Sequence, residues 1–351
     1  MNRKIRRSEG GVLPRPRSSD LLICLFLLLP ACPQPAQPQT AQPPPPYYPP
    51  PYGYPPTPYG QPQPAPAPGP APYPAPAPAP APNRPLLPAL VGPAAWQGET
   101  RAVLAELVAA LSPDKQQLVT GIPLVFDQDP TDVNAFAGCD DSGAPFIEGT
   151  EGLLEVVDGI SQTKACDELF GTRTYDAYTA AVTPSLVSPR GGSGMLPGGI
   201  IPPQYWADAR RISRAHEIFD EMVAFTFGHE LSHHYLGHTG CAHGQPAGVP
   251  PVLSDLNRVV TSGCSFCNQW NEAAADANGC NNMLDAARAR SSRAYAWNEE
   301  GGIWLLDFFA RLDGASGNTG ALSFVRSHPN PALRIPALQT DATLWRFQHP
   351  G

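Results

Sequence analysis

The chain has 351 residues, of which 46 are proline, and a formal net charge of −8. An acidic chain without a basic face binds nucleic acid poorly, because neutralisation of phosphates supplies most of that affinity. Composition and charge therefore exclude nucleic acid as an expected partner.

A short apolar run near the amino terminus indicates an export signal. Residues 21–29 read LLICLFLLL and follow a basic stretch, and the run is too short to span a bilayer as a helix. It ends in Leu29-Pro30-Ala31-Cys32, which resembles the lipobox of bacterial lipoproteins. This resemblance implies that residues 1–32 are a signal peptide and that Cys32 is lipidated. Plain signal cleavage near Ala31 is the alternative.

The lipobox also predicts where the chain resides. A lipid on Cys32 would anchor it to a membrane of the bacterial cell envelope, with the following domain outside the cytoplasm. In Gram-negative lipoproteins an Asp after the lipidated cysteine favours the inner membrane, and Pro33 at this position instead favours the outer one. Residues 33–85 are so rich in proline that they cannot bury a core, which predicts a disordered, extended tether.

From residue 86 to residue 351 the composition is that of an ordinary globular domain. We expect a single α+β domain that is mostly helical, with a small sheet beside the longest helix. Periodic apolar positions predict helices over residues 99–111, 151–169, 208–237, 268–290 and 296–312.

Cysteine usage in this domain suggests disulfides, because an even number in an exported chain is typical of a disulfide framework. The spacing of Cys264 and Cys267 would also fit half of a zinc knuckle, but no second such pair exists to complete it. The pairing stays open among six residues, which are Cys139, Cys166, Cys241, Cys264, Cys267 and Cys280.

The strongest chemical signal lies in the helix predicted over residues 208–237. It contains His229-Glu230-Leu231-Ser232-His233, with the two histidines at positions i and i+4. That spacing places both imidazoles on one helix face, where they can share a metal ion, and Glu230 next to them can reach a water molecule.

The next predicted helix supplies the rest of a metal site. Glu272 is the natural third ligand, and Asp276 lies one turn further on the same face, where it could orient a ligand histidine. Two histidines and one glutamate leave the fourth position open to water, as in catalytic zinc sites. We therefore expect one zinc ion per chain, bound by His229, His233 and Glu272.

Four blocks of the chain together resemble the M48 family of zinc metallopeptidases. Two are the metal-binding motif and the Glu272–Asp276 pair, and the others flank them on either side. The resemblance implies a gluzincin-type domain in an exported form without transmembrane helices. The flanking blocks are residues 133–137 with 146–147 and 152–154, and Ser327-His328-Pro329 with Arg334-Ile335.

The resemblance implies a zinc endopeptidase that hydrolyses peptides or unfolded proteins of the envelope, with Glu230 as the general base. It makes His328 and Arg334 the catalytic donors to the oxyanion, on a loop stiffened by Pro329 and Pro331. A family-like edge strand near residues 133–137 would pair with an extended substrate.

Other interpretations stay open. The chain could be a catalytically inactive, zinc-containing binding or chaperone-like lipoprotein, or it could hydrolyse cell-wall peptides or another amide. His328 could be a turn residue, and Arg334 a structural ion-pair partner. His234 and His238 lie at other helical angles than the ligands, so that they either support the ligands from beside them or are exposed, and His216 and His243 receive no role. Residues 304–309 fit a helix that faces the core.

Overall fold

The computed structural model describes residues 85–140, 142–188, 190–241, 265–290, 296–317, 328 and 330–350. The chain divides into residues 1–71 and 72–351, and every element below belongs to the second unit. The expected signal peptide, the lipidation site Cys32 and the expected tether up to residue 84 lie outside the described residues. Among the described helices, none combines the length and the apolar character needed to cross a bilayer.

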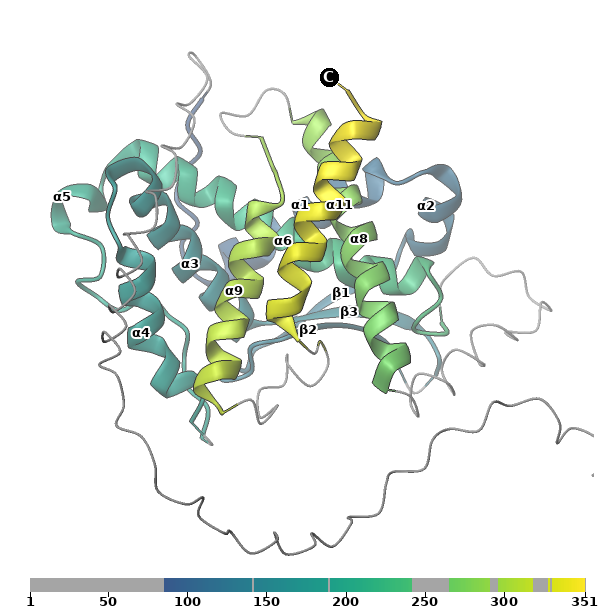
Figure 1. Cartoon of the computed structure of the whole chain (residues 1–351), viewed down its shortest axis with the longest axis horizontal. Helices are drawn as coiled ribbons and strands as arrows, with labels where there is room; N and C mark the ends of the chain where they lie inside the picture. The colour runs from purple at the N-terminus through teal and green to yellow at the C-terminus, as the bar shows by residue number, and fades with distance from the viewer. Residues whose placement is uncertain are drawn as a thin grey trace, which may run out of the picture. The chain divides into compact units, whose positions relative to one another are not determined.

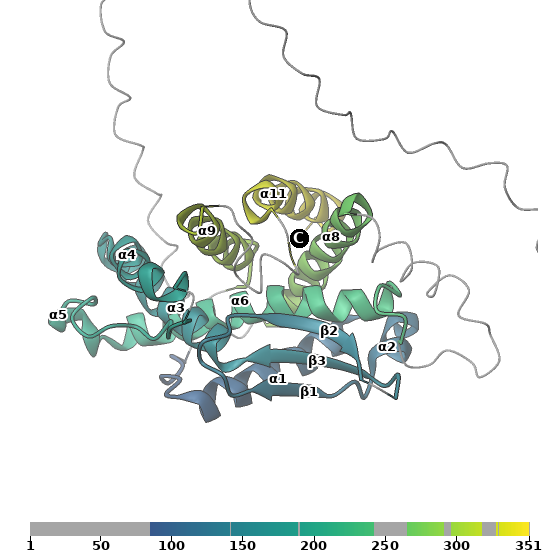
Figure 2. The same cartoon turned by 90° about the horizontal axis from the view of Figure 1, so that it is seen from below.

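A small mixed sheet forms one layer of this unit (Figure 2). Its strands are β1 (Leu124–Asp127), β2 (Ala135–Cys139) and β3 (Pro145–Thr150), in the order β1-β3-β2. β1 runs parallel to β3 and β2 runs antiparallel to it, so that Ile147 pairs with both Leu124 and Ala137. β2 is therefore an edge strand among the described residues.

The longest helix, α6 (Ala209–Tyr235), lies along the sheet beside β2 and β3 (Figure 2). Its start is fixed by Asp208, whose side chain accepts the backbone N–H of Arg210 at 2.9 Å. Nearly every residue from Arg211 to Tyr235 is buried, because helices cover the sides of α6 that the sheet leaves open. Burial of a side chain as large as Phe219 or Phe227 contributes about 1.5–3 kcal/mol.

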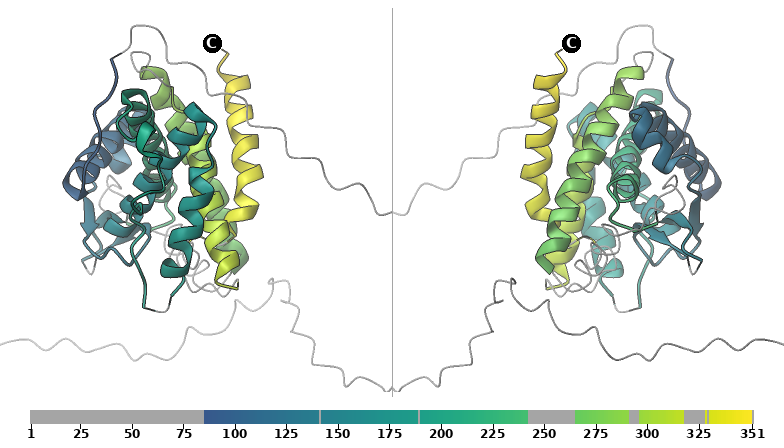
Figure 3. Two further views of the ribbon diagram at one scale, coloured as in Figure 1. Left: turned by 90° about the vertical axis from the view of Figure 1, so that its left-hand side faces the viewer. Right: turned by 90° about the vertical axis from the view of Figure 1, so that its right-hand side faces the viewer.

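On the side of α6 away from the sheet lie α8 (Ser265–Ala289), α9 (Glu300–Ala315) and α11 (Pro331–Gln348), as Figures 1 and 2 show. Figure 3 shows α11, in yellow, running beside the green helices α8 and α9. Residues 304–309 lie on α9, and Leu305, Leu306, Phe308 and Phe309 are buried, as their pattern predicts.

The remaining helices complete the unit. α1 (Pro93–Ala110) packs on α6 and α8, and α3 (Glu151–Phe170) packs on α6 directly after β3. Thr150, the last residue of β3, caps α3 by accepting the backbone N–H of Leu153. Three further helices are α2 (Pro113–Val119), α4 (Thr174–Leu186) and α5 (Pro203–Trp206).

The structure confirms the coarse fold class: the unit is mostly helical, with a small sheet beside α6. The five predicted helices overlap α1, α3, α6, α8 and α9, with ends displaced by up to about six residues. One expectation about secondary structure was wrong. We expected a loop stiffened by prolines near Arg334, but this residue lies on α11, which begins at Pro331.

One disulfide links Cys139 at the end of β2 to Cys241, which follows α6. Disulfides were expected for all the cysteines of this domain, and two of them contradict that expectation. Cys166 on α3 and Cys280 on α8 are free and buried. The side chains of Cys264 and Cys267 lie outside the described residues.

Candidate metal centre

Two helices bring the three expected metal ligands together. The Nε2 atoms of His229 and His233, both on α6, lie 3.1 Å apart. Glu272 on α8 places one carboxylate oxygen 3.4 Å from His229 Nε2 and the other 3.5 Å from His233 Nε2. The structure therefore joins residues that are separated by about forty positions in the sequence.

These separations fit a divalent metal ion. Zinc bonds to nitrogen and oxygen of about 2.0–2.1 Å at tetrahedral angles separate neighbouring ligand atoms by about 3.3 Å. Two imidazole nitrogens and a carboxylate are also donors that zinc prefers. His229 and Glu272 are buried, whereas the side chain of His233 keeps 12% of its surface exposed. His233 therefore marks the side on which the group is open to solvent.

The expected orienting contact is present. Asp276 Oδ1 lies 2.9 Å from His229 Nδ1, so that the N–H of Nδ1 can be donated to the carboxylate and Nε2 is left to face Glu272. Burial works to raise the pKa of Asp276, but the adjacent Arg334 outweighs it and lowers this pKa to about 2. Asp276 is thus ionised where it can hold the ligand histidine in one tautomer.

Arg334 is placed against Asp276. Its Nε and one terminal nitrogen donate to the two Asp276 oxygens at 2.7 and 2.6 Å, and its other terminal nitrogen lies 3.7 Å from Glu272. The guanidinium is buried, and this forked pairing matches the geometry of a carboxylate. These contacts favour a positioning role for Arg334, while the predicted contact with an oxyanion stays a prediction.

Glu230 lies on the same face as the metal ligands. Its Oε1 is 4.0 Å from His229 Nε2 and 3.4 Å from His328 Nε2, and its Oε2 is buried without a hydrogen-bond partner. Burial raises the pKa of Glu230, and the histidines and the Ala137 backbone oppose that effect. A carboxylate oxygen with no partner is available to a water molecule or substrate.

His328, which precedes α11, joins this group. Its Nδ1 lies 2.7 Å from Glu272 Oε2, and its Nε2 lies 3.2 Å from the carbonyl oxygen of Ala135 on β2. Both ring nitrogens therefore face oxygen acceptors, and the nitrogen that carries the proton can donate to its oxygen. The same position brings His328 within the set of four residues whose ligand atoms lie within 4.8 Å of one another. Its neighbours Ser327 and Pro329 lie outside the described residues.

Of the two further histidines beside the motif, one contacts a metal ligand. His238, in the turn after α6, places its Nδ1 2.9 Å from His233 Nδ1. His234 points to the sheet instead, with its Nε2 2.9 Å from the carbonyl oxygen of Phe146 on β3. Both histidines had been excluded as ligands, but only the turn that follows α6 shows that His238 meets the far nitrogen of His233.

Comparison with known protein families, with curated proteins and with solved structures gives no match for this chain. The buried His and Glu groups, which could hold a metal ion, therefore stand on their own geometry.

Proposed function

We propose that this protein is a zinc-dependent endopeptidase of the gluzincin type, related to the M48 family. The observation that carries the proposal is the convergence of His229, His233 and Glu272 beside Glu230, whose Oε2 has no hydrogen-bond partner. A ligand set of two histidines and one glutamate with a free carboxylate beside it is what peptide hydrolysis by activated water requires.

A bound zinc ion would polarise the scissile carbonyl and lower the pKa of water to about 7. Glu230 then accepts the proton of the attacking water and returns it to the leaving amine as general acid. Its buried position supports this role, because burial weakens the preference of a carboxylate for its charged form.

His328 is the candidate donor to the developing oxyanion. It lies 3.4 Å from Glu230 and is fixed by Glu272 on one side and by β2 on the other, so it is preorganised. Arg334 has an indirect role in this proposal. It holds Asp276 in place, and Asp276 orients His229.

The substrate is proposed to be an extended peptide or an unfolded protein that lies along β2. This strand is at the sheet edge among the described residues, and its residue Ala135 already contacts His328. An added strand would take its affinity from backbone hydrogen bonds and would place a peptide bond beside the metal ligands.

We further propose that the protein works in the bacterial cell envelope on exported proteins. The Cys139–Cys241 disulfide supports an oxidising compartment. Anchoring through a lipid on Cys32, with the outer membrane as the favoured location, rests on the lipobox-like sequence alone.

The test uses the full-length chain, loaded with zinc and incubated with an unfolded protein such as reduced casein. We expect cleavage that a chelator abolishes, that added zinc restores, and that His233→Ala lacks. As a matched control, His349→Ala changes a histidine that stacks on Trp345 at the end of α11, and it should leave cleavage intact. Absence of cleavage by the zinc-loaded wild-type chain would contradict the proposal.

A second candidate function is supported by the position of His328 within the group of four possible ligands. If His328 were a fourth ligand, the site would be closed and the protein would be a zinc-containing binding lipoprotein without turnover. His328→Gln separates the two. The peptidase proposal expects this variant to retain its zinc and lose most of its activity, whereas a closed site would release the metal.

A further inference from the structure

A second group of metal-ligating side chains lies at the other end of α6. His216 and Asp220 are separated by one helical turn, as His229 and His233 are, and Glu99 reaches them from α1. His216 and His229 are thirteen positions apart, which is about 20 Å along a helix. The second group therefore cannot share an ion with the first.

The hydrogen bonds of His216 determine what its second nitrogen can do. Nδ1 lies 2.7 Å from the carbonyl oxygen of Pro88, and a carbonyl only accepts, so Nδ1 carries the proton of a neutral ring. Nε2 then presents a lone pair toward Glu99 Oε1 at 3.4 Å and Asp220 Oδ1 at 3.8 Å. In the neutral ring, three electron-rich atoms then face one another, and either a metal ion between them or a proton on Nε2 would relieve this arrangement.

The buried atoms agree with this interpretation. Asp220 is fully buried and His216 is 7% exposed, and neither Asp220 Oδ1 nor His216 Nε2 has a hydrogen-bond partner. A polar atom buried without a partner costs about 1–3 kcal/mol, so two of them aimed at one point indicate a missing ligand. An imidazole that ligates a metal through one nitrogen and donates the other N–H to a carbonyl is the usual arrangement at metal sites.

The charged groups around this cluster are net negative, which favours a divalent cation. Arg290 contacts Asp220 Oδ2 at 2.8 Å, Glu106 at 2.6 Å and Glu217 at 3.5 Å. With Glu99 included, the cluster contains four carboxylates and one guanidinium. Arg290 occupies the far oxygen of Asp220, which leaves Oδ1 to the proposed ion. A guanidinium also lies beside a ligand carboxylate in the first group, where Arg334 contacts Glu272 at 3.7 Å.

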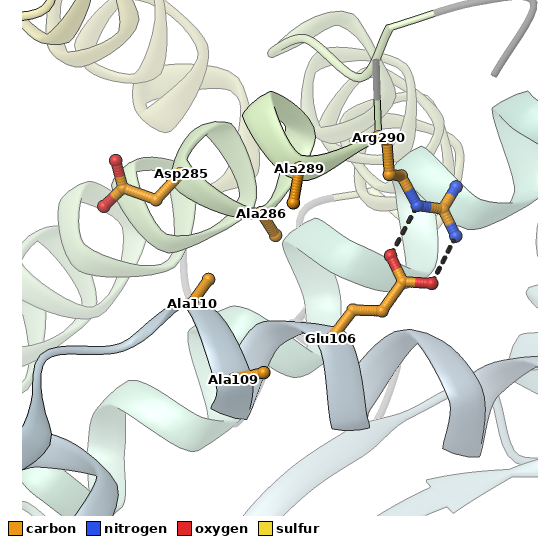
Figure 4. Close-up of a pocket in the computed structure, with 7 residues that line it drawn as sticks. All are labelled: Glu106, Ala109, Ala110, Asp285, Ala286, Ala289 and Arg290. Carbon is orange, nitrogen blue, oxygen red and sulfur yellow. Dashed lines mark hydrogen bonds and ion pairs between the residues drawn. The ribbon is translucent and has the colours of Figure 1, made fainter. Parts of the chain in front are cut away.

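A cavity lies beside the Arg290 side chain. It has a volume of about 390 Å³ and lies between α1 and α8, with the Glu106–Arg290 pair on its wall (Figure 4). Arg290, which lies on the wall of this cavity, also contacts Asp220.

We propose that Glu99, His216 and Asp220 form a second site for a divalent transition-metal ion, with zinc as the best match to nitrogen and carboxylate donors. The ion fastens α1 to α6 and so stabilises the domain. This site is independent of the proposed peptidase centre, because the two share no residue.

The test counts zinc ions bound to the full-length chain after dialysis, by mass spectrometry. We expect two per chain in wild type, one in Glu99→Gln and one in a His229→Gln/His233→Gln variant. Glu106→Gln is the matched control, because it changes another α1 carboxylate that contacts Arg290 but not His216, and it should retain two. The remaining zinc should still raise the melting temperature of the His229→Gln/His233→Gln variant.

Two results would contradict the second metal site. One zinc per chain in wild type, lost completely in the His229→Gln/His233→Gln variant, would show that His216 is instead an imidazolium paired with the carboxylates. Two ions in both wild type and Glu99→Gln would place the second ion elsewhere. His216→Gln, which removes the nitrogen ligand, repeats the test if Glu99→Gln does not fold.

Discussion

Gly279 on α8 lies against the backbone of His229 on α6. A Cβ atom added to Gly279 would be 2.7 Å from the His229 backbone nitrogen and 2.9 Å from the carbonyl carbon of Gly228. The backbones of the two helices therefore lie in close contact at the first metal ligand. This crossing sets the distance between the histidines of α6 and Glu272, which lies two turns before Gly279 on α8.

Gly279→Ala should consequently separate the helices and disturb the metal centre. Because the methyl group meets backbone atoms that cannot move aside, we expect a loss of about 2 kcal/mol or more in the free energy of unfolding, together with weaker zinc binding. Gly98→Ala is the control, since Gly98 lies on α1 with open space around it. This variant should be slightly more stable than the wild type, because glycine is less favourable than alanine inside a helix. Urea unfolding of both variants checks the prediction, and equal effects would contradict it.

Asp276→Asn should weaken the metal centre without removing a ligand. The variant keeps an oxygen that can accept from His229, but it loses the charge that Arg334 neutralises. We expect the zinc dependence of cleavage to shift to about 10–100-fold higher free zinc. Asp285→Asn, on the same helix and hydrogen-bonded to Trp345, should leave this dependence unchanged. The same zinc dependence in both variants would argue against an orienting role for Asp276.

Removing the Cys139–Cys241 disulfide should destabilise the domain. The bridge closes a loop of 102 residues, for which loss of unfolded-chain entropy predicts about 4–5 kcal/mol. Urea unfolding should show this loss in Cys139→Ser/Cys241→Ser, and a reductant should then have no comparable further effect on that variant. Equal stability of the variant and the oxidised wild type would show that the bridge does not constrain the unfolded chain.

The stability should also depend on pH through Asp158 on α3. Burial raises the pKa of this carboxyl from 3.8 to about 6, and Gln162 and Arg211 only partly oppose the effect. Between these two values the folded protein holds a proton that the unfolded chain has released. The contribution of Asp158 therefore makes the free energy of unfolding fall as pH rises from about 4 to 6, by at most about 3 kcal/mol.

Asp158→Asn should remove this contribution, because its amide does not ionise and its oxygen can still accept from Gln162. Relative to wild type, the variant should gain stability between pH 4.5 and pH 7. Urea unfolding at both values measures the difference. A stability difference that is the same at both pH values would show that Asp158 ionises as readily in the folded protein as in the unfolded chain.

The metal helix could be predicted from the sequence because its signal is local. The spacing of His229 and His233 and the apolar periodicity around them depend on one helix alone. Among the helices that escaped prediction, α4 and α11 each contain a proline, Pro184 and Pro336. Proline usually ends a helix, but packing of α11 on α8 and α9 overrides that local preference.

Contacts between distant elements could not be predicted in the same way. Arg334 was expected near the oxyanion, yet its contacts with Asp276 depend on how α11 docks on α8. His216 received no role, although its spacing to Asp220 repeats that of the first histidine pair. Only the packing of α1 on α6 brings Glu99 to them, and no local pattern encodes that approach.

The central claim is hydrolysis with Glu230 as the base, and Glu230→Gln tests it most directly. Zinc content and cleavage of an unfolded protein would be measured on the same preparation of the full-length chain. The account predicts unchanged zinc and cleavage reduced by at least about 100-fold, because the ligands remain and the base is lost. Cleavage at the wild-type rate by the zinc-loaded variant would contradict it and remove Glu230 from the reaction.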